Sequence, residues 1–124
     1  MTGDLRGVVV GHGSVAAAMV AAAEEISGIK GVFVPVSNSG LDRAALEERI
    51  VTAVGDGPAL IFVDMPSGSC LIAAMRRLSS RPDVKVVTGV NLVMLLEFLF
   101  HRGEPVADAA RRAAETGAKS IAER

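Results

Sequence analysis

A histidine held between two glycines is the residue of this sequence best suited to chemistry. His12 follows three consecutive valines and stands between Gly11 and Gly13. Three valines in a row are typical of a strand buried on both faces, and the alanine-rich residues 15–26 that follow have the composition of a helix. We therefore expect His12 in a strand-to-helix turn, where open α/β sheets bind ligands beside helix N-termini.

An aspartate and a serine-rich loop supply the groups that such a histidine needs. A carboxylate such as Asp64, which ends a later apolar run, could accept a hydrogen bond from one ring nitrogen of His12. The bond would fix the tautomer and leave the other nitrogen as a nucleophile for a phosphoryl group. The candidate donors to phosphoryl oxygens are the hydroxyl and N–H groups of Gly13, Ser14, Ser67, Gly68 and Ser69. Because the G-x-x-x-x-G-K-[ST] nucleotide loop does not occur in the chain, we expect a phosphoryl donor other than ATP.

Each of these residues also has a purely structural interpretation. His12 could merely occupy a turn, and Asp64 could simply end its strand. Ser69 could be a helix N-cap. Asn91 is expected to be a helix cap, with a part in shaping the site as the alternative.

Strand-like and helix-like segments alternate along the chain and must position these residues. Strands are expected at residues 8–10, 32–36, 59–63 and 84–88, each followed by a helical pattern, with a last helix from Pro105 to about Gly117. This alternation predicts a doubly wound, mainly parallel α/β sheet with helices on both faces. The carboxyl ends of parallel strands share one rim, so His12 and Asp64 can meet if the first and third strands are neighbours.

Three segments carry further structural signals. Pro35 cannot donate to a ladder, which places the second strand at an edge or ends it near the proline. Ser39 with Asp42 resembles a helix start. The fourth helix has a leucine stripe at residues 92, 95, 96 and 99, with more apolar residues on its other sides. That surplus is too large for one buried face, so this helix is either enclosed within the domain or meets a second subunit, which we favour in so small a domain.

Composition excludes several classes of function. The formal net charge of −1 and the scattered basic residues provide no stripe for nucleic acid. The single cysteine, Cys70, allows no internal disulfide and no cysteine-based metal cluster, and we expect a small buried residue there. No apolar run approaches the roughly 18 residues of a membrane span, and the first residues lack a signal core. We expect a cytoplasmic protein without a cofactor, a bound metal or membrane insertion.

Three motifs, taken in order, resemble one protein family. They are Gly11-His12-Gly13, Asp64-x-x-x-Gly68-Ser69 and Gly89-Val90-Asn91-Leu92-x-Met94-Leu95-x-Glu97. Their order and spacing are similar to those of the mannose-type (mannose/fructose/sorbose) IIA domain of the bacterial phosphoenolpyruvate-dependent sugar phosphotransferase system. The similarity covers almost the whole chain and implies a single IIA domain over residues 1–124.

The resemblance implies a phosphocarrier. His12 would accept a phosphoryl group from the carrier HPr and pass it to a IIB component for sugar uptake, and Asp64 would orient the ring. The resemblance also implies a homodimer, a sheet order of 2-1-3-4, and a segment at about residues 118–123 that adds an antiparallel edge strand to the partner. Two departures stand out: the usual Gly-Gly-Ser-Pro is Ser67-Gly68-Ser69-Cys70 here, and this chain carries no IIB domain, which leaves the sugar open.

Two other functions remain open from the sequence. A stand-alone regulator of the same fold, which reports its phosphorylation state to a partner, would use the same His12. The residues from Val10 to Ser14 also resemble the opening of tetrapyrrole metal chelatases, in which this histidine is a metal ligand or base. Such a site usually needs a second histidine. The other histidine here, His101, lies in a helix without a matching motif, and we expect it to be a surface or C-terminal cation.

Overall fold

The structure is a computed structural model that describes residues 4–124, in which a four-stranded parallel sheet is flanked by five helices. The strands are β1 (Arg6–Gly11), β2 (Phe33–Ser37), β3 (Ala59–Val63) and β4 (Val84–Thr88). The helices are α1 (Val15–Ser27), α2 (Arg43–Val54), α3 (Ser69–Leu78), α4 (Leu92–Leu99) and α5 (Val106–Lys119). The strand order β2-β1-β3-β4 confirms the predicted topology and places β2, with Pro35, at an edge.

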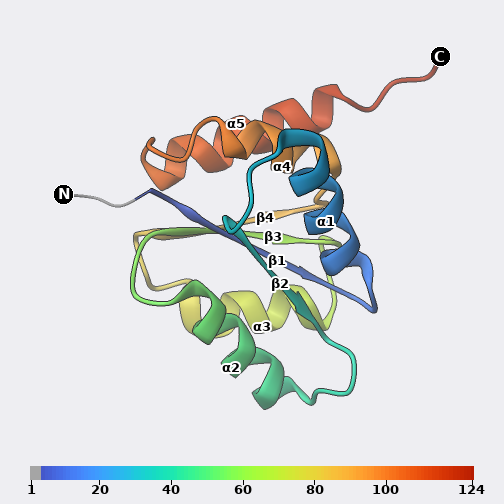
Figure 1. Cartoon of the computed structure of the whole chain (residues 1–124). Coiled ribbons are helices and arrows are strands. Elements are labelled where there is room, and N and C mark those ends of the chain that lie inside the picture. The colour runs from blue at the N-terminus through green and yellow to red at the C-terminus, as the bar shows by residue number, and fades with distance from the viewer. Residues whose placement is uncertain (1–3) are drawn as a thin grey trace.

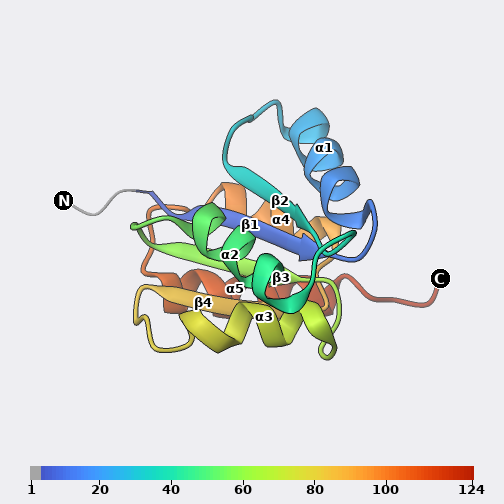
Figure 2. The same cartoon turned by 90° about the horizontal axis from the view of Figure 1, so that it is seen from below.

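Helices cover both faces of the sheet, which explains why its central strands read as continuous apolar runs. Helices α1, α4 and α5 lie on one face, and α2 and α3 lie on the other (Figures 1 and 2). Successive side chains of β1 alternate between the two layers: Val9 joins the first core, while Val8 and Val10 join the second. Both central strands are therefore buried on both faces.

Three of the four phenylalanines gather in the first core. Phe33, Phe62 and Phe98 have ring centroids 5.3 to 6.3 Å apart, two of the three pairs edge to face. Such contacts stabilise a pair of rings by about 0.5–1.5 kcal/mol beyond the area that they bury. There is little free space around these rings, since a Cβ added at Gly7 would lie 2.5 Å from Cδ1 of Phe33. This aromatic cluster packs α4 against β2 and β3.

Side-chain caps set the start of two helices, and Ser39, expected with Asp42 at the start of α2, lies in the turn before it. Asp42 is the N-cap of α2, and its carboxylate accepts a hydrogen bond from the Ala45 N–H at 2.8 Å. Asn91 caps α4 in the same way through Met94, and its side-chain amide also donates to the Gly117 carbonyl. Ser69 is not a cap: Gly68 takes that position, and Ser69 is the first residue of α3.

Two expectations connected with the dimer concern α4 and the residues after α5. Helix α4 is largely enclosed, because its buried residues Met94, Leu95, Phe98 and Leu99 face the sheet and its neighbouring helices. Its surplus of apolar residues therefore gives little support for a second subunit. The strand expected at about residues 118–123 is not formed in the single chain, because α5 continues to Lys119. Residues 121–124 pair with no strand of the described chain and extend away from the body (Figure 1).

The carboxyl ends of the strands form one rim, and the site lies there. Val10 of β1 is paired with Val63 of β3, so the residues that follow these two strands lie side by side. None of the helices in the described part of the chain combines the length and hydrophobicity needed to cross a bilayer.

Candidate functional site

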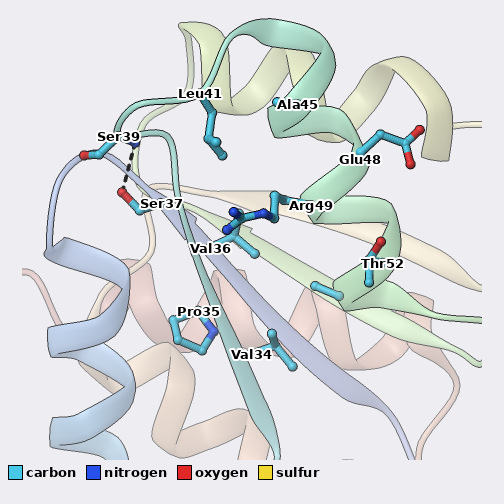
Figure 3. A pocket seen from close by; sticks show the side chains of 11 residues that line it. Val34, Pro35, Val36, Ser37, Ser39, Leu41, Ala45, Glu48, Arg49 and Thr52 are labelled. Carbon is cyan, nitrogen blue, oxygen red and sulfur yellow. Dashed lines mark hydrogen bonds between the residues drawn. The ribbon is translucent and has the colours of Figure 1, made fainter.

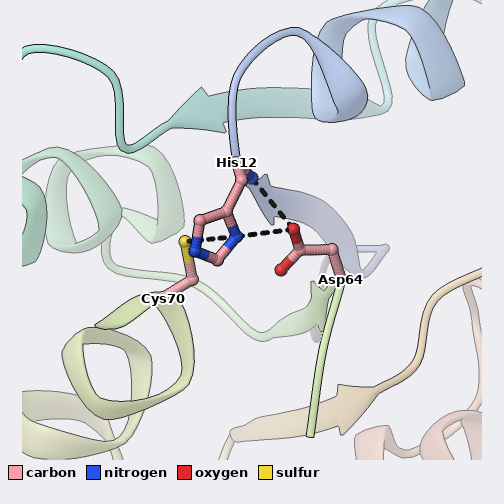
Figure 4. A group of neighbouring side chains, drawn as sticks. All are labelled: His12, Asp64 and Cys70. Carbon is pink, nitrogen blue, oxygen red and sulfur yellow. Dashed lines mark hydrogen bonds and ion pairs between the residues drawn. The ribbon is translucent and has the colours of Figure 1, made fainter. Parts of the chain in front are cut away.

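His12 and Asp64 meet at the rim, as the sequence predicts. The Asp64 Oδ2 atom lies 2.8 Å from Nδ1 of His12 and also accepts the His12 backbone N–H at 2.9 Å (Figure 4). One carboxylate oxygen thus holds both the ring and the backbone of the histidine. The absence of a side chain on Gly11 leaves room for this contact, since a Cβ there would lie 3.4 Å from the same oxygen and 2.6 Å from Cγ1 of Val15.

The charge of Asp64 decides which nitrogen of His12 can react. Burial opposes ionisation of this carboxyl, but the hydrogen bonds from His12 outweigh burial and lower the pKa of Asp64 below its ordinary value. The carboxylate carries no proton at neutral pH, so Nδ1 must be the donor in the 2.8 Å contact. In the neutral ring Nε2 then holds the lone pair. The His12 side chain is 42% exposed and Asp64 only 14%, so the ring remains accessible while its partner is sheltered.

The turn after β2 supports the backbone that follows His12, a role that the sequence did not reveal. The Ser37 hydroxyl donates to the Gly13 carbonyl at 2.8 Å, and the Asn38 side-chain oxygen accepts the Gly13 N–H at 3.3 Å. Gly13 has a φ of 58°, a conformation in which residues with a Cβ are uncommon. Ser37 and Asn38 belong to a Ser-Asn-Ser-Gly turn signal, and only the strand order shows that this turn touches the histidine loop.

Cys70 contacts His12 at the N-terminus of α3. Its sulfur lies 3.9 Å from Nδ1 of His12, and the residue is fully buried, as expected from the sequence. Burial raises the pKa of the Cys70 thiol, and the negative charge of Asp64 raises it further. Because Cys70 is the second residue of α3, this contact places the amino end of that helix, with its free N–H groups, beside the histidine.

The predicted phosphoryl-binding residues all lie in the segments that border His12. Gly13 and Ser14 follow it directly and are exposed, although the Gly13 N–H is already engaged by Asn38. The exposed residues Ser67, Gly68 and Ser69 form the approach to α3. Gly68 has a φ of 93°, which turns the chain sharply into the helix.

A separate groove adjoins the site without including His12. It has a volume of about 700 Å³ and lies between β2 and α2, with Ser37 and Ser39 at the end near the histidine loop (Figure 3). The rest of its wall is formed by aliphatic residues and the polar side chains of Glu48, Arg49 and Thr52. His12 lies outside this groove, and its side chain is 42% exposed.

The second histidine lies at the opposite end of the sheet from His12, near the amino ends of the strands. His101 follows α4, and the backbone next to it is bonded to the start of β1, where the Leu5 N–H donates to the Arg102 carbonyl. Its Nδ1 lies 2.7 Å from a carboxylate oxygen of Glu97. The two histidines do not converge, so the paired-histidine site of a chelatase is not formed.

Comparisons with known proteins agree with this geometry. The model of the family described as EIIA-man, PTS system fructose IIA component, matches residues 7–115. No curated protein matches the chain.

Solved structures show the same fold over nearly the whole chain. Phosphotransferase system component EIIA from Streptococcus agalactiae has a TM-score of 0.88 at 21% identity, covering 96% of each chain. The mannose/sorbose-specific IIA subunit from Enterococcus faecalis has a TM-score of 0.84 at 20% identity, covering 98% of this chain and 96% of its own. A putative sugar phosphotransferase system permease from Klebsiella pneumoniae has a TM-score of 0.86 at 21% identity, covering 99% and 93%.

Proposed function

Because the chain belongs to the family of phosphotransferase system fructose IIA components, we propose that it is a phosphocarrier that takes a phosphoryl group onto Nε2 of His12. The donor is phospho-HPr and the acceptor is a IIB component that serves sugar uptake and phosphorylation. The observation that carries the proposal is the 2.8 Å contact between Asp64 and Nδ1, which leaves the exposed Nε2 as the nucleophile.

Transfer to His12 is a direct exchange of one bond to phosphorus for another. The Nε2 lone pair forms a bond to phosphorus as the bond between phosphorus and the donor breaks, and the bonding electrons leave with the donor. The ring keeps its Nδ1 proton and gains positive charge, which the Asp64 carboxylate neutralises. Passing the group to the acceptor reverses these changes and restores the neutral ring.

The phosphoryl oxygens need hydrogen-bond donors, and none of the candidate donors near His12 is a basic side chain. The first-turn N–H groups of α3 and the hydroxyls of Ser14, Ser67 and Ser69 are proposed for this role, with the backbone of Gly13 and Gly68 shaping the two loops. Support comes from the contact between Cys70 and His12, which brings the amino end of α3 to the ring. Helix N-termini bind phosphate in this way through oriented N–H groups and the helix dipole.

The wider assignments are also proposals. Residues 1–124 act as one IIA domain in the cytoplasm, peripheral to a membrane permease complex, and two copies form a homodimer. The exposed edge of β4 and the extended residues 121–124 are compatible with strand exchange between the copies.

The proposal is tested by reconstituting the phosphoryl transfer. Incubation with phosphoenolpyruvate, enzyme I and HPr is expected to add one acid-labile phosphate per chain, measured by intact-mass spectrometry. His12→Ala is expected to remain unlabelled, while His101→Ala, which removes the distant histidine, is labelled normally. Phosphate on the His12→Ala variant would refute the assignment.

Onward transfer separates the phosphocarrier from the regulator. The purified phosphorylated protein is mixed with a mannose-type IIB domain, and its half-life is compared with that in buffer. The phosphocarrier loses its phosphate to IIB within the mixing experiment. A phosphorylated protein that is stable toward every IIB domain of its host supports the regulator instead.

A further inference from the structure

Three side chains with different ligand atoms converge beneath the rim. Nδ1 of His12, a carboxylate oxygen of Asp64 and Sγ of Cys70 all lie within 4.8 Å of one another (Figure 4). They come from the loop after β1, the end of β3 and the start of α3, so three separate elements bring them together. Phosphoryl transfer as proposed above uses the first two residues and gives the thiol no role.

We propose that these residues form a binding site for a thiophilic divalent cation, Zn²⁺ foremost, whose occupation blocks phosphorylation of His12. Thiolate, imidazole and carboxylate are the three ligand types that Zn²⁺ takes in proteins, and softer cations share the preference for sulfur. Magnesium and calcium, which take oxygen ligands, are not expected to bind here. A fourth ligand would have to be a water molecule, because among the described residues only these three offer ligand atoms here.

Two of the three ligand distances require only small adjustments, and the third, between the Asp64 carboxylate and Cys70 Sγ, lies within 4.8 Å. Tetrahedral Zn²⁺ with ordinary bond lengths separates its ligand atoms by about 3.3–3.6 Å. In the structure Nδ1 is 2.8 Å from Asp64 Oδ2 and 3.9 Å from Cys70 Sγ, so the first distance must lengthen and the second shorten by less than an ångström. The partly exposed His12 ring can supply this movement by rotating on its side-chain bonds.

An unpartnered oxygen adds a second observation. Asp64 Oδ1 is buried and accepts no hydrogen bond from the described residues. A buried carboxylate oxygen without a partner is costly, and a cation that contacts both oxygens of Asp64 would satisfy it. The carboxylate and the thiolate together neutralise the two charges of the cation, and the thiol proton is released to solvent on binding.

The chemistry of the ring makes metal binding and phosphorylation mutually exclusive; this step rests on the proposed function. Neutral imidazole has one N–H and one lone pair. When the Nδ1 lone pair coordinates Zn²⁺, the proton resides on Nε2, which then has no lone pair to attack phosphorus. Conversely, phosphorylation at Nε2 requires the proton on Nδ1 and denies that atom to the metal. By linkage, phosphorylation must weaken metal binding by the same factor by which metal disfavours phosphorylation.

Metal binding itself is tested without any phosphotransferase component. Titration with Co²⁺ is expected to produce one equivalent of a thiolate-to-cobalt charge-transfer band in the near ultraviolet, which Zn²⁺ then abolishes by displacement. Calorimetry should show that Cys70→Ala and Cys70→Ser each lower Zn²⁺ affinity more than about 100-fold, beyond the loss typical of an outer-shell change. Circular dichroism confirms that the variants are folded.

A matched histidine control separates this site from a surface contact. His101 lies near Glu97 and Glu104 and could bind Zn²⁺ weakly on its own. Zn²⁺ affinity is expected to fall in His12→Ala and to remain unchanged in His101→Ala. The absence of a charge-transfer band, or Zn²⁺ binding that survives in Cys70→Ala but not in His101→Ala, overturns the proposal.

The consequence for phosphorylation is a second, separate readout. Zn²⁺ at ten times its dissociation constant is expected to lower the initial rate of His12 phosphorylation about ten-fold by mass action. HPr and enzyme I are checked for their own response to Zn²⁺, and the Cys70→Ala rate should not respond. A charge-transfer band together with an unchanged rate of His12 phosphorylation would show that the metal binds but does not block phosphorylation. Failure of phosphorylation without metal would count against the proposed function alone.

Discussion

Hydrogen bonding by Asp64 selects the reactive nitrogen of His12. A single oxygen, Oδ2, accepts both the ring N–H and the backbone N–H of the histidine, so the ring has one tautomer and one orientation. Histidine alone in a turn would present either nitrogen. In the proposed transfer, the carboxylate also provides the negative charge that balances the phosphorylated, cationic ring.

Replacing Asp64 by asparagine tests the contribution of that charge. Asp64→Asn keeps an oxygen that can accept a hydrogen bond from Nδ1–H but removes the negative charge. The rate of phosphoryl transfer to His12 should therefore fall by about 100-fold, within the range for a positioned acid–base group. Rapid-quench measurement of phosphorylation by phospho-HPr checks this. Asp108→Asn, at a surface ion pair of α5, is the matched control and should leave the rate unchanged. An unaltered rate in Asp64→Asn would remove Asp64 from the mechanism.

The lowered pKa of Asp64 has a consequence for stability. The folded pKa is below the unfolded value of about 3.9. Ionised Asp64 therefore stabilises the fold at pH values above the unfolded pKa, and this contribution is lost as the pH falls through the folded pKa. The difference in unfolding free energy between the wild type and Asp64→Asn, from urea titrations at pH 7 down to pH 3, should be constant near neutrality and shrink below about pH 4. A difference that holds steady to pH 3 would contradict the assigned shift.

The turn after β2 is the element that holds the His12 loop in place. The Ser37 hydroxyl links two loops by donating to Gly13 while accepting the Ser39 N–H. We predict that Ser37→Ala lowers the phosphorylation rate several-fold and stability by about 1 kcal/mol, the typical value of one hydrogen bond. Ser80→Ala, an exposed serine in the turn after α3, is the control. Kinetics and thermal unfolding of both variants check the prediction, and equal behaviour of the two would show that the loop needs no such support.

Substitutions at two glycines of β1 distinguish an effect on stability from an effect on the geometry of the site. Gly7→Ala places a methyl group against Phe33, and Gly11→Ala places one against Val15 and Asp64. Each should lower stability by about 1–3 kcal/mol through overpacking. Only Gly11→Ala should also slow phosphorylation at temperatures where both variants are fully folded. Denaturation curves and rates measured together decide this, and a slower rate in Gly7→Ala alone would argue against the distinction.

Sequence patterns predicted some elements better than others. Strands β3 and β4 begin and end where the apolar runs do, and Asp42 caps α2 as its residue type indicates. Helix faces were harder to predict. In α1 the larger apolar residues Val15 and Ile26 are exposed, whereas Ala16 and Val20 are buried. In a helix rich in alanine many faces are equally apolar, so the packing partner, not the pattern, selects the buried one.

At the scale of the whole molecule, topology brings the site together. The neighbouring positions of β1 and β3 follow from the alternation of strands and helices, and they allowed the meeting of His12 and Asp64 to be predicted. The contacts of Cys70 and Asn38 with the His12 loop could not be predicted, because they depend on how the loops after β2 and β3 bend toward it. Periodicity gives no information about loop conformation.

Apolar surface that remains exposed leads to a prediction about assembly. Phe100 is 71% exposed and Ile121 is 80% exposed, and the outer edge of β4 is unpaired in the single chain. We predict a dimer at micromolar concentration by multi-angle light scattering. Ile121→Glu should shift the equilibrium toward monomer, because a charge replaces an apolar contact, whereas Glu123→Gln should not. A monomer at 100 micromolar, a concentration of roughly the order at which weak dimers form, would contradict the prediction.

The identity of the phosphorylated nitrogen tests the central claim most directly. The protein is labelled with ¹⁵N in histidine, phosphorylated through phosphoenolpyruvate, enzyme I and HPr, and examined by long-range ¹H–¹⁵N correlation spectroscopy. The account predicts phosphate on Nε2 of His12, with the proton retained on Nδ1 beside Asp64. Phosphate on Nδ1, or on any residue other than His12, would contradict it.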